Sequence, residues 1–234
     1  KYDFHGGLFG FVAPNLFLYY ANLDACEATG WMLFFHHELL AGKPLAREIK
    51  SFGFFNYAVN EALHLSKQEE QAIENLFENM YTEYAQRIDK FSKSVIISNL
   101  ELLLTYSKRF YGRQFLTRNE VDSTFLEKFY KKLNHYFSSE QLIQQGFPTA
   151  SFFADQLQLS TNYLSDLLKT ITGKTTREHI HFRIIELAKE KLLGTNLSVA
   201  QIAHSLGFEY PQYFNRLFKE KTGQTPKAFR HKDN

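Results

Sequence analysis

The stretch SVAQIAHSLGFEYPQYFNRLFKEKTGQTPKAFR, residues 198–230, decides how the rest of the chain is interpreted. Ser198 and Gln201 have the spacing of a capping box, which begins a helix by satisfying its first unpaired N–H groups. Ile202, Ala203 and Leu206 give that helix one apolar face. Gly207 follows, and glycine ends helices because the left-handed conformation costs it little. The stretch therefore begins with a short amphipathic helix that stops at a tight turn.

A second short helix is predicted directly after this turn. Pro211 suits its first position, where the missing N–H would have no partner in any case. The apolar residues that recur at helical spacing indicate its buried face: Tyr213, Phe214, Leu217 and Phe218. The outer face carries side chains of the types that bind base edges and phosphates: Gln212, Asn215, Arg216 and Lys219. Two such helices joined by a glycine turn predict a helix-turn-helix.

The segment ADQLQLSTNYLSDLLKTITGKT, residues 154–175, repeats this pattern. Leu157 and Leu159 match Leu206 and Phe208 at an offset of 49. The later turn then has one extra residue, after which six positions match at an offset of 50: Tyr163, Leu164, Leu168, Lys169, Gly173 and Thr175 correspond to Tyr213, Phe214, Phe218, Lys219, Gly223 and Thr225. The chain therefore contains a duplicated module, with helix-turn-helix motifs expected at about 149–172 and 198–222.

The duplicated pattern resembles the DNA-binding domain of AraC/XylS-type bacterial transcription regulators. Its residues are Ile202-Ala203, Leu206-Gly207-Phe208, Tyr213-Phe214, Arg216, Phe218-Lys219, Gly223, Thr225-Pro226 and Phe229-Arg230. The resemblance covers roughly the last 110 residues. Upstream, FFNYAVNEALHLS at 54–66 and KRFYGRQFLTR at 108–118 are similar to regulators of this family that carry a cupin-type sensor domain.

Length and composition set further limits. A chain of 234 residues is long enough for two modest domains with cores of their own. Its one cysteine, Cys26, allows no intrachain disulfide and indicates a reducing cytoplasm. We find no apolar run of 18 residues and no signal peptide, so we expect a soluble, cytoplasmic protein without a membrane partner. The chain starts at Lys1 without an initiator Met, which leaves open whether the N-terminal domain is truncated.

The charge is unevenly distributed along the chain. Residues 147–234 contain 12 Lys and Arg against 8 Asp and Glu, a net charge of +4. Residues 1–146 contain 15 against 17, a net charge of −2. The basic part is the part with the duplicated helices, which suits a polyanionic partner. Without the motif, this charge would equally describe a solvated helical surface.

The N-terminal part predicts a partial β-domain. Short aromatic-rich runs punctuated by Pro and Gly indicate strands at 8–20, 31–36 and 54–57, with a helical turn at 38–43. These strands are too few for a full small barrel. The resemblance therefore implies only the later half of a cupin.

From Ser66 the pattern becomes helical. Ser66 and Glu69 form a second capping box, and the following helix has one apolar stripe: Ile73, Leu76, Phe77, Met80, Tyr84 and Ile88. The next helix is predicted from about 92 to 109, with Ile96, Leu100, Leu103 and Leu104 facing inward. Such an antiparallel pair either packs within its own chain or forms a homodimer interface. The resemblance favours the interface.

The C-terminal half is predicted to be entirely helical. Asp122 is expected to cap a helix through about Tyr136, with Phe125, Phe129, Leu133 and Phe137 inward. Thr149 and Ser160 open the two helices of the first motif. One helix from Thr175 to Leu193 joins the motifs, with Ile180, Ile184, Leu187, Ala188 and Leu192 on its buried face. At about 1.5 Å per residue it spans about 25–30 Å, close to the ~34 Å repeat of the major groove.

The predicted fold class is mostly α. We divide the chain into a partial cupin-like sensor segment with its helical dimerisation pair at 1–112, a linker at 113–121 and a DNA-binding domain at 122–234. The β part of the sensor segment covers about 1–60 and the helical pair about 66–110. The linker assignment rests on the polar, aperiodic sequence GRQFLTRNEV at 112–121.

The resemblance implies which side chains read DNA. In the first motif they are Thr161, Asn162, Ser165, Asp166 and Lys169, and in the second Pro211, Gln212, Asn215, Arg216 and Lys219. Asn162, Gln212 and Asn215 suit adenine, and Arg216 suits guanine or a phosphate. The two lysines suit phosphates, which set affinity without sequence preference. Asp166 departs from the family, where a basic or amide residue is common, and it leaves open whether the first motif reads sequence.

The sequence contains no convincing catalytic or metal site. His36, His37 and Glu38 are adjacent, and together with His5 they raise the hypothesis of a metal site, since cupins often bind metals through His and Glu. On a predicted strand, however, adjacent side chains point to opposite faces, so we expect no metal. Cys26 has no basic neighbour that would activate it. No phosphate loop or catalytic triad is present in the sequence, and we expect neither a cofactor nor an enzymatic activity.

We therefore interpret the chain as a DNA-binding transcription regulator whose partner is a double-stranded promoter operator. The resemblance implies further partners: a second copy through residues 66–110, a small-molecule effector on the N-terminal part, and RNA polymerase. Two alternatives remain open at this point. One is a cupin-type small-molecule-binding protein or metalloenzyme, and the other is a protein-binding adaptor that has lost DNA binding.

Overall fold

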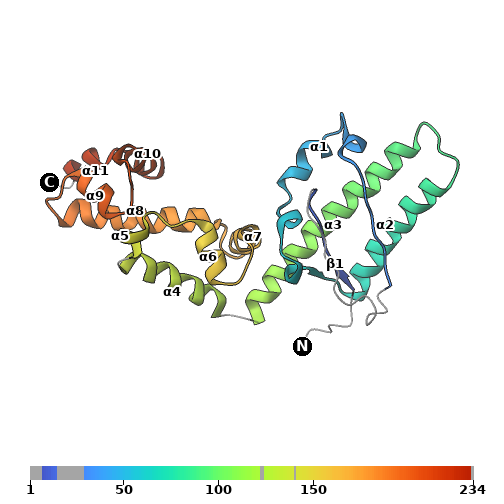
Figure 1. Cartoon of the computed structure of the whole chain (residues 1–234), viewed down its shortest axis with the longest axis horizontal. Helices are drawn as coiled ribbons and strands as arrows, with labels where there is room; N and C mark the ends of the chain where they lie inside the picture. The colour runs from blue at the N-terminus through green and yellow to red at the C-terminus, as the bar shows by residue number, and fades with distance from the viewer. Residues whose placement is uncertain (1–6, 15–28, 122–123, 140, 233–234) are drawn as a thin grey trace. The chain divides into compact units, whose positions relative to one another are not determined.

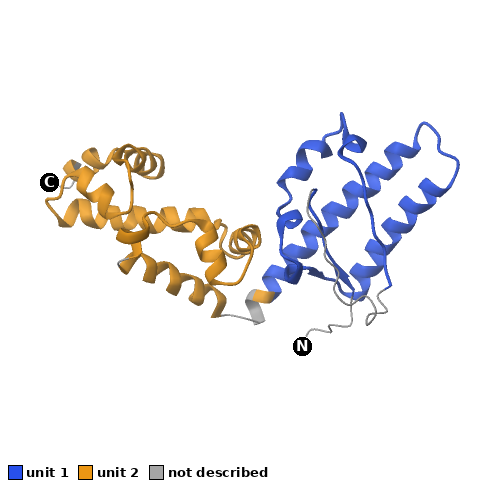
Figure 2. Cartoon of the chain, viewed as in Figure 1, with its two compact units in different colours: residues 1–117 blue, residues 118–234 orange. Residues whose placement is uncertain are grey.

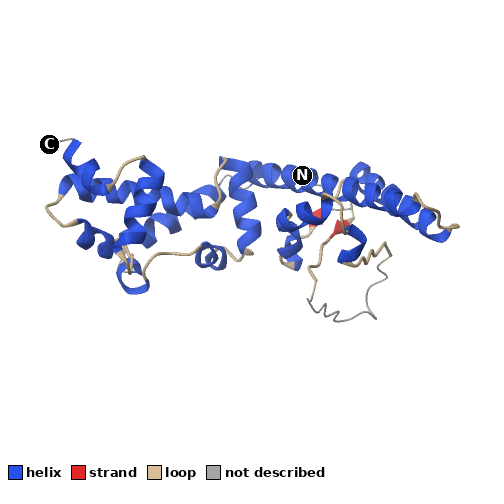
Figure 3. Cartoon of the chain, turned by 90° about the horizontal axis from the view of Figure 1, so that it is seen from above, coloured by secondary structure: helices blue, strands red, loops and turns tan. Residues whose placement is uncertain are grey.

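The computed structural model describes residues 7–14, 29–121, 124–139 and 141–232 (Figure 1). The chain divides into two compact units, residues 1–117 and 118–234 (Figure 2). Helices make up most of the described structure, and strands are confined to one short pair (Figure 3). The prediction of a mostly α chain is confirmed.

Unit 1 is built around an antiparallel pair of helices, α2 (Lys67–Ala85) and α3 (Ser92–Val121). The predicted capping box begins α2: the Ser66 N–H donates to Glu69 Oε2 at 2.8 Å, and the Glu69 N–H donates to Ser66 Oγ at 3.4 Å. The buried residues of the pair include Ile73, Leu76, Phe77, Met80, Ile97, Leu100, Leu103 and Leu104, whereas Ile96, predicted inward, is half-buried. Tyr84 and Ile88, also predicted inward, are 70% and 66% exposed, because α2 ends at Ala85.

Helix α3 continues to Val121, so residues 113–121, predicted as an irregular linker, are helical. Two side chains of this segment attach it to the strand region beside it. Arg113 donates to the His64 carbonyl through Nη2 at 2.7 Å, and its Nε donates to Glu69 Oε1 of α2, also at 2.7 Å. Gln114 accepts the His64 N–H at 2.8 Å and donates to the Ala62 carbonyl at 3.2 Å, as a neighbouring strand would. The linker prediction missed these contacts because polar side chains that anchor a helix look the same in sequence as solvated ones.

The strands are much shorter than predicted. β1 (Leu8–Phe9) pairs antiparallel with β2 (Leu63–His64), and Phe9 lies opposite Leu63. The sequence predicts a strand at 8–20. Among its described residues, 8–14, only Leu8–Phe9 form a strand, and residues 15–20 lie outside the described part of the chain. Residues 31–36 form no strand, and a 3-10 turn, η4 (Gly53–Asn56), replaces the strand predicted at 54–57. A cupin-like domain is therefore not confirmed.

The aromatic residues of this region form a packed cluster on α3, which explains the wrong strand predictions. The Phe54 ring stacks on Tyr111 at 5.7 Å, and Tyr57 meets Tyr111 edge-on at 5.1 Å. Aromatic residues favour strands in sequence statistics, but that preference reflects packing on a half-buried surface, which a helix also offers. The remaining short elements are η2 (His37–Leu40), which confirms a turn near 38–43, then α1 (Leu45–Glu48), η3 (Ile49–Ser51) and η5 (Val59–Glu61).

Unit 2 is entirely helical within its described residues. Its helices are α4 (Thr124–Ser138), α5 (Gln141–Gln145), α6 (Ala150–Gln156), α7 (Thr161–Thr172), α8 (Thr176–Gly194), α9 (Val199–Ser205), α10 (Pro211–Thr222) and α11 (Pro226–Lys232). The predicted inward residues of α4 are buried: Phe125, Phe129, Leu133 and Phe137. Asp122, expected to cap α4, lies outside the described residues. Helix α8 packs against both motifs and joins them into one unit.

Candidate nucleic-acid interface

The two predicted helix-turn-helix motifs are α6–α7 and α9–α10. Each begins at a predicted cap. Phe152 donates its N–H to Thr149 Oγ1 at 3.2 Å in the first motif, and Gln201 donates to Ser198 Oγ at 3.2 Å in the second. Ser160 caps α7 by accepting the Tyr163 N–H, also at 3.2 Å. Pro211 occupies the first position of α10.

The two turns share the same backbone geometry, which supports the duplication. The Leu159 N–H donates to the Ala154 carbonyl at 3.0 Å, and the Phe208 N–H donates to the Ala203 carbonyl at 3.0 Å. Both turns contain one residue with positive φ. It is Gly207 at +79° in the second motif and Gln158 at +57° in the first.

The second helices of the two motifs, α7 and α10, also end with the same backbone geometry. Gly173 and Gly223 cap them in the left-handed conformation, with φ of 77° and 78°. Just before them, Thr172 Oγ1 donates to the Leu168 carbonyl and Thr222 Oγ1 to the Phe218 carbonyl, both at 2.7 Å. The two modules are therefore structural repeats, at the offsets of 49 in the turns and 50 in the second helices that the sequence contains.

The buried faces of α7 and α10 differ at two positions. At one, Leu167 is buried while its counterpart Leu217 is half-buried. At the other, Tyr163 in α7 is buried, whereas Tyr213, its counterpart in α10, is 50% exposed. The prediction that Tyr213 faces inward is therefore wrong. Its ring meets Tyr210 edge-on at 5.8 Å, and the Arg216 guanidinium lies 5.7 Å from its centroid. Tyr213 therefore belongs to the outer face of α10. Sequence analysis missed this because helical spacing does not show whether a residue lies at the edge or at the centre of the apolar face.

The candidate DNA-reading residues are distributed unequally between the two helices. On α10 the polar candidates are all exposed, beside a half-buried Pro211: Gln212, Asn215, Arg216 and Lys219. On α7 the two ends are exposed, at Thr161 and Lys169. Between them, Asn162, Ser165 and Asp166 are half-buried. The second helix therefore offers the more open polar face.

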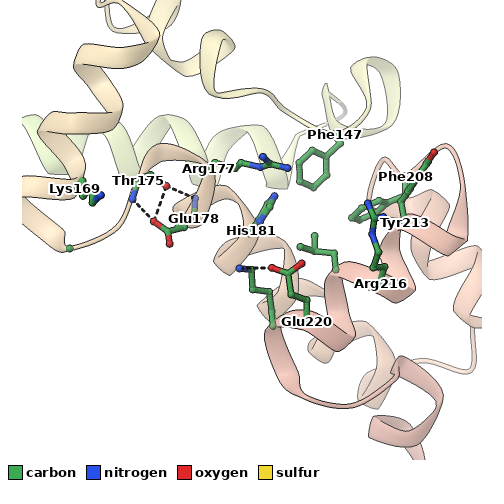
Figure 4. Close-up of a pocket in the computed structure, with 13 residues that line it drawn as sticks. Phe147, Lys169, Thr175, Arg177, Glu178, His181, Phe208, Tyr213, Arg216 and Glu220 are labelled. Atoms are coloured by element: carbon green, nitrogen blue, oxygen red, sulfur yellow. Dashed lines mark hydrogen bonds and ion pairs between the residues drawn. The ribbon is translucent and has the colours of Figure 1, made fainter. Parts of the chain in front are cut away.

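A groove of about 740 Å³ lies between α7, α8 and α10 (Figure 4). Lys169 and Arg216, which the sequence analysis predicted as DNA contacts, both line it. The groove also contains residues that sequence analysis missed, among them Phe147, Arg177, His181, Glu220 and Lys221. The spacing of Arg177 and His181, four residues apart in a predicted helix, would have placed these two on one face.

Hydrogen bonds lower the pKa of two carboxyl groups at this groove. Glu178 Oε2 accepts the Thr175 N–H at 2.7 Å and the Thr175 hydroxyl at 2.8 Å, and these bonds lower the pKa of Glu178. Glu220 pairs with Lys221 at 3.0 Å, and that hydrogen bond lowers the pKa of Glu220. Burial lowers the pKa of His181, and the nearby Arg177 and Lys221 charges act in the same direction.

The histidine cluster of unit 1 differs from its predicted geometry. Residues 36–38 are not in a strand, so the argument from alternating strand faces is wrong. The His36 and His37 rings are 4.2 Å apart, and the ligand atoms of His36, His37 and Glu38 all lie within 4.8 Å of one another. All three are exposed, and His36 Nδ1 accepts the Glu38 N–H at 3.4 Å. Cys26 and His5 lie outside the described residues.

Residues 153–232 match the family model of a helix-turn-helix domain. This span contains α7, α8, α9, α10 and α11, and therefore both second helices described above. Residues 153–232 are therefore similar to helix-turn-helix domains of AraC-type regulators.

Known proteins match the chain over a similar length. The bifunctional transcriptional activator/DNA repair enzyme AdaA of Bacillus subtilis is 38% identical over 82 residues, 35% of this chain and 39% of AdaA. The regulatory protein SoxS of Salmonella typhimurium is 34% identical over 70 residues, 30% of this chain and 65% of SoxS. The chain thus covers less than two thirds of either relative.

Among solved structures, the C-terminal domain of the two-component response regulator yesN from Fusobacterium nucleatum is 33% identical. The match covers 39% of this chain and 92% of that domain, with a TM-score of 0.35. Within the described residues, no helix has the length and apolar character needed to cross a membrane.

Proposed function

We propose that the chain is a sequence-specific DNA-binding transcription regulator, in which α7 and α10 read DNA. The observation that carries this proposal is the pair of structurally repeated helix-turn-helix motifs joined by α8. Helix α8 has 19 residues and is therefore about 28 Å long. This length suits two recognition helices that enter successive segments of the major groove on one face of a duplex, about 34 Å apart.

The side chains divide into two roles in this proposal. Asn162, Gln212 and Asn215 pair with adenine edges, and Arg216 with guanine or a phosphate. Thr161, Ser165, Asp166 and Pro211 line the same surfaces, and Lys169 and Lys219 contact phosphates. Because the α10 residues are more exposed than those of α7, we expect the second motif to contribute more sequence preference.

We infer that unit 1 supplies the dimer interface, with residues 1–112 as a sensor segment and 122–234 as the DNA-binding domain. The buried stripe of α2 is used within the chain, but the far end of the α2–α3 pair leaves apolar side chains exposed: Tyr81, Tyr84, Ile88, Phe91 and Val95. We name these five residues the hairpin patch. Exposed apolar side chains that gather in one part of a fold are candidates for an interaction site. A second copy would cover it, and a small-molecule effector on the rest of unit 1 would alter how paired domains meet DNA and RNA polymerase.

Selection of bound sequences from a random duplex pool tests the proposed function. The wild-type chain should enrich a defined sequence, and Arg216→Ala and Gln212→Ala should each lose part of it. Lys131→Ala is the matched control, because Lys131 is exposed on α4 and does not line the groove. If the wild-type chain enriches nothing at low salt, the proposal is wrong and the protein-binding adaptor becomes the better interpretation.

A further inference from the structure

The groove between the two motifs has an excess of positive charge. Four cationic side chains line it, Lys169, Arg177, Arg216 and Lys221, against two carboxylates, Glu178 and Glu220. Figure 4 shows Arg177 directed into the groove toward Phe147, with Glu220 across from it on α10. The cations come from α7, α8 and α10, so the fold brings together charges that are far apart in the sequence.

The two carboxylates do not neutralise all of the positive charge in the groove. Glu178 is engaged by the N–H and hydroxyl of Thr175 at the start of α8. Glu220 is paired with Lys221. In the part of the chain that the structure describes, Arg177 and Arg216 form no close ion pair. Two guanidinium groups in the groove therefore remain available to a ligand, and guanidinium favours phosphate through its planar fork of donors.

We propose that the sugar–phosphate backbone of the duplex crosses this groove between the two recognition helices and is held by Arg177 and Lys221 without regard to base sequence. This inference rests on the proposed function. Lys169 lies in α7 and Arg216 in α10, and both line the groove. A duplex that engages both helices must therefore pass its backbone over the surface between them, where Arg177 is placed.

Glu220 limits the strength of this contact. Its carboxylate neutralises Lys221 and places a negative charge beside the path of the phosphates. Removal of that charge should therefore strengthen DNA binding. This gives the inference a variant that gains affinity, which a damaged fold cannot imitate.

The test is the salt dependence of binding to the sequence that the full chain selects. A variant that can no longer bind one of the phosphates should have a slope of log K against log salt that is smaller by about one unit. Arg177→Ala should therefore lower the slope by about one. Arg177→Ala with Lys221→Ala should lower it further, but by less than a second full unit, because Glu220 already neutralises part of the Lys221 charge. Base preference should be unchanged in both. Lys131→Ala, which removes one positive charge outside the groove, should keep the wild-type slope.

Glu220→Gln should bind the same sequence more tightly than wild type, with a slope at least as steep. If the wild-type chain binds selectively but Arg177→Ala keeps its slope and Glu220→Gln its affinity, the groove lies off the duplex and this inference is wrong. The proposed function would then still stand. If the wild-type chain shows no selective binding, both are wrong.

Discussion

Gly207, in the turn of the second motif, lies directly against Gly146, in the segment between α5 and α6. A Cβ on Gly207 would lie 2.7 Å from the Gly146 carbonyl carbon and 2.8 Å from the Phe147 nitrogen. The contact is supported on both sides: Tyr136 Oη donates to the Gly146 carbonyl at 3.0 Å, and the Phe147 and Phe208 rings lie 5.1 Å apart. The turn of the second motif is thus packed against the start of the first.

Gly207→Ala should destabilise unit 2, because the Cβ meets backbone that cannot move aside and φ is +79°. Strain from positive φ and from overpacking together should cost about 2 kcal/mol or more in the free energy of unfolding. Urea denaturation measures this. Gly173→Ala is the matched control, because Gly173 has φ of +77° but open space around its Cβ position. If both variants lose the same amount of unfolding free energy, the contact with Gly146 does not contribute to stability.

Truncation of two neighbouring aromatic residues of α10 should reduce the free energy of unfolding by very different amounts. Phe214 is fully buried, whereas Tyr213 is 50% exposed. Phe214→Ala should cost about 3–5 kcal/mol, and Tyr213→Ala about 0.5 kcal/mol or less. Thermal or urea unfolding separates the two. Since the Tyr213 ring lies beside Arg216, its truncation should weaken DNA binding while the fold is kept. A large loss of stability in Tyr213→Ala would place that ring inside the core instead.

Unit 2 should lose stability on mild acidification. His179 is buried, its Nε2 lies 2.8 Å from Thr172 Oγ1, and its Phe129 and Tyr130 neighbours shield it from water. This burial lowers the pKa of His179 below 6.5 in the folded chain. The unfolded chain therefore binds the proton more readily, so the free energy of unfolding is greatest above pH 6.5 and falls as pH decreases toward the folded pKa.

Urea denaturation between pH 5 and 7 tests this sign. His179→Gln should reduce the pH dependence of the free energy of unfolding. The lowered pKa of His181 should account for a further part of that dependence, with the same sign. His135→Gln is the control, because His135 is exposed on α4. Stability that increases on acidification over this range would contradict the account.

The hairpin patch should control the oligomeric state. Ile88 is 66% exposed near the end of α2, so a charge there does not disturb the monomer core. If a second copy covers the patch, Ile88→Glu should shift sedimentation from dimer to monomer and leave helix content unchanged. Glu78→Gln, a change on the exposed side of α2 outside the patch, serves as the control. A wild-type chain that sediments as a monomer at all concentrations would contradict the dimer proposal.

The sequence predicts unit 2 well because its signals are local. Caps at Thr149, Ser160 and Ser198, and the glycines that end α7 and α10, act within a few residues and hold in the structure. Unit 1 is predicted less well because its aromatic residues pack on α3 over separations of about 50 residues, as Tyr111 does with the Glu61 carbonyl. Local preference carries no information about such partners.

The same limit explains the parts of the candidate site that sequence analysis missed. The outer faces of α7 and α10 follow from helical spacing within each motif. The groove requires Arg177 from α8 to meet Arg216 and Lys221 from α10, which only the packing of the two motifs brings about. The exposure of Tyr213 likewise depends on its neighbours in space.

The most direct test of the central claim is to map which base positions depend on each recognition helix. Sequences selected by Asn162→Ala and by Gln212→Ala should be compared with those of the wild-type chain. Two reading helices predict that each variant loses preference in a different half of the site, with the halves about 10 base pairs apart. Loss at the same positions in both variants, or loss in neither, would contradict a chain that reads DNA with both of its motifs.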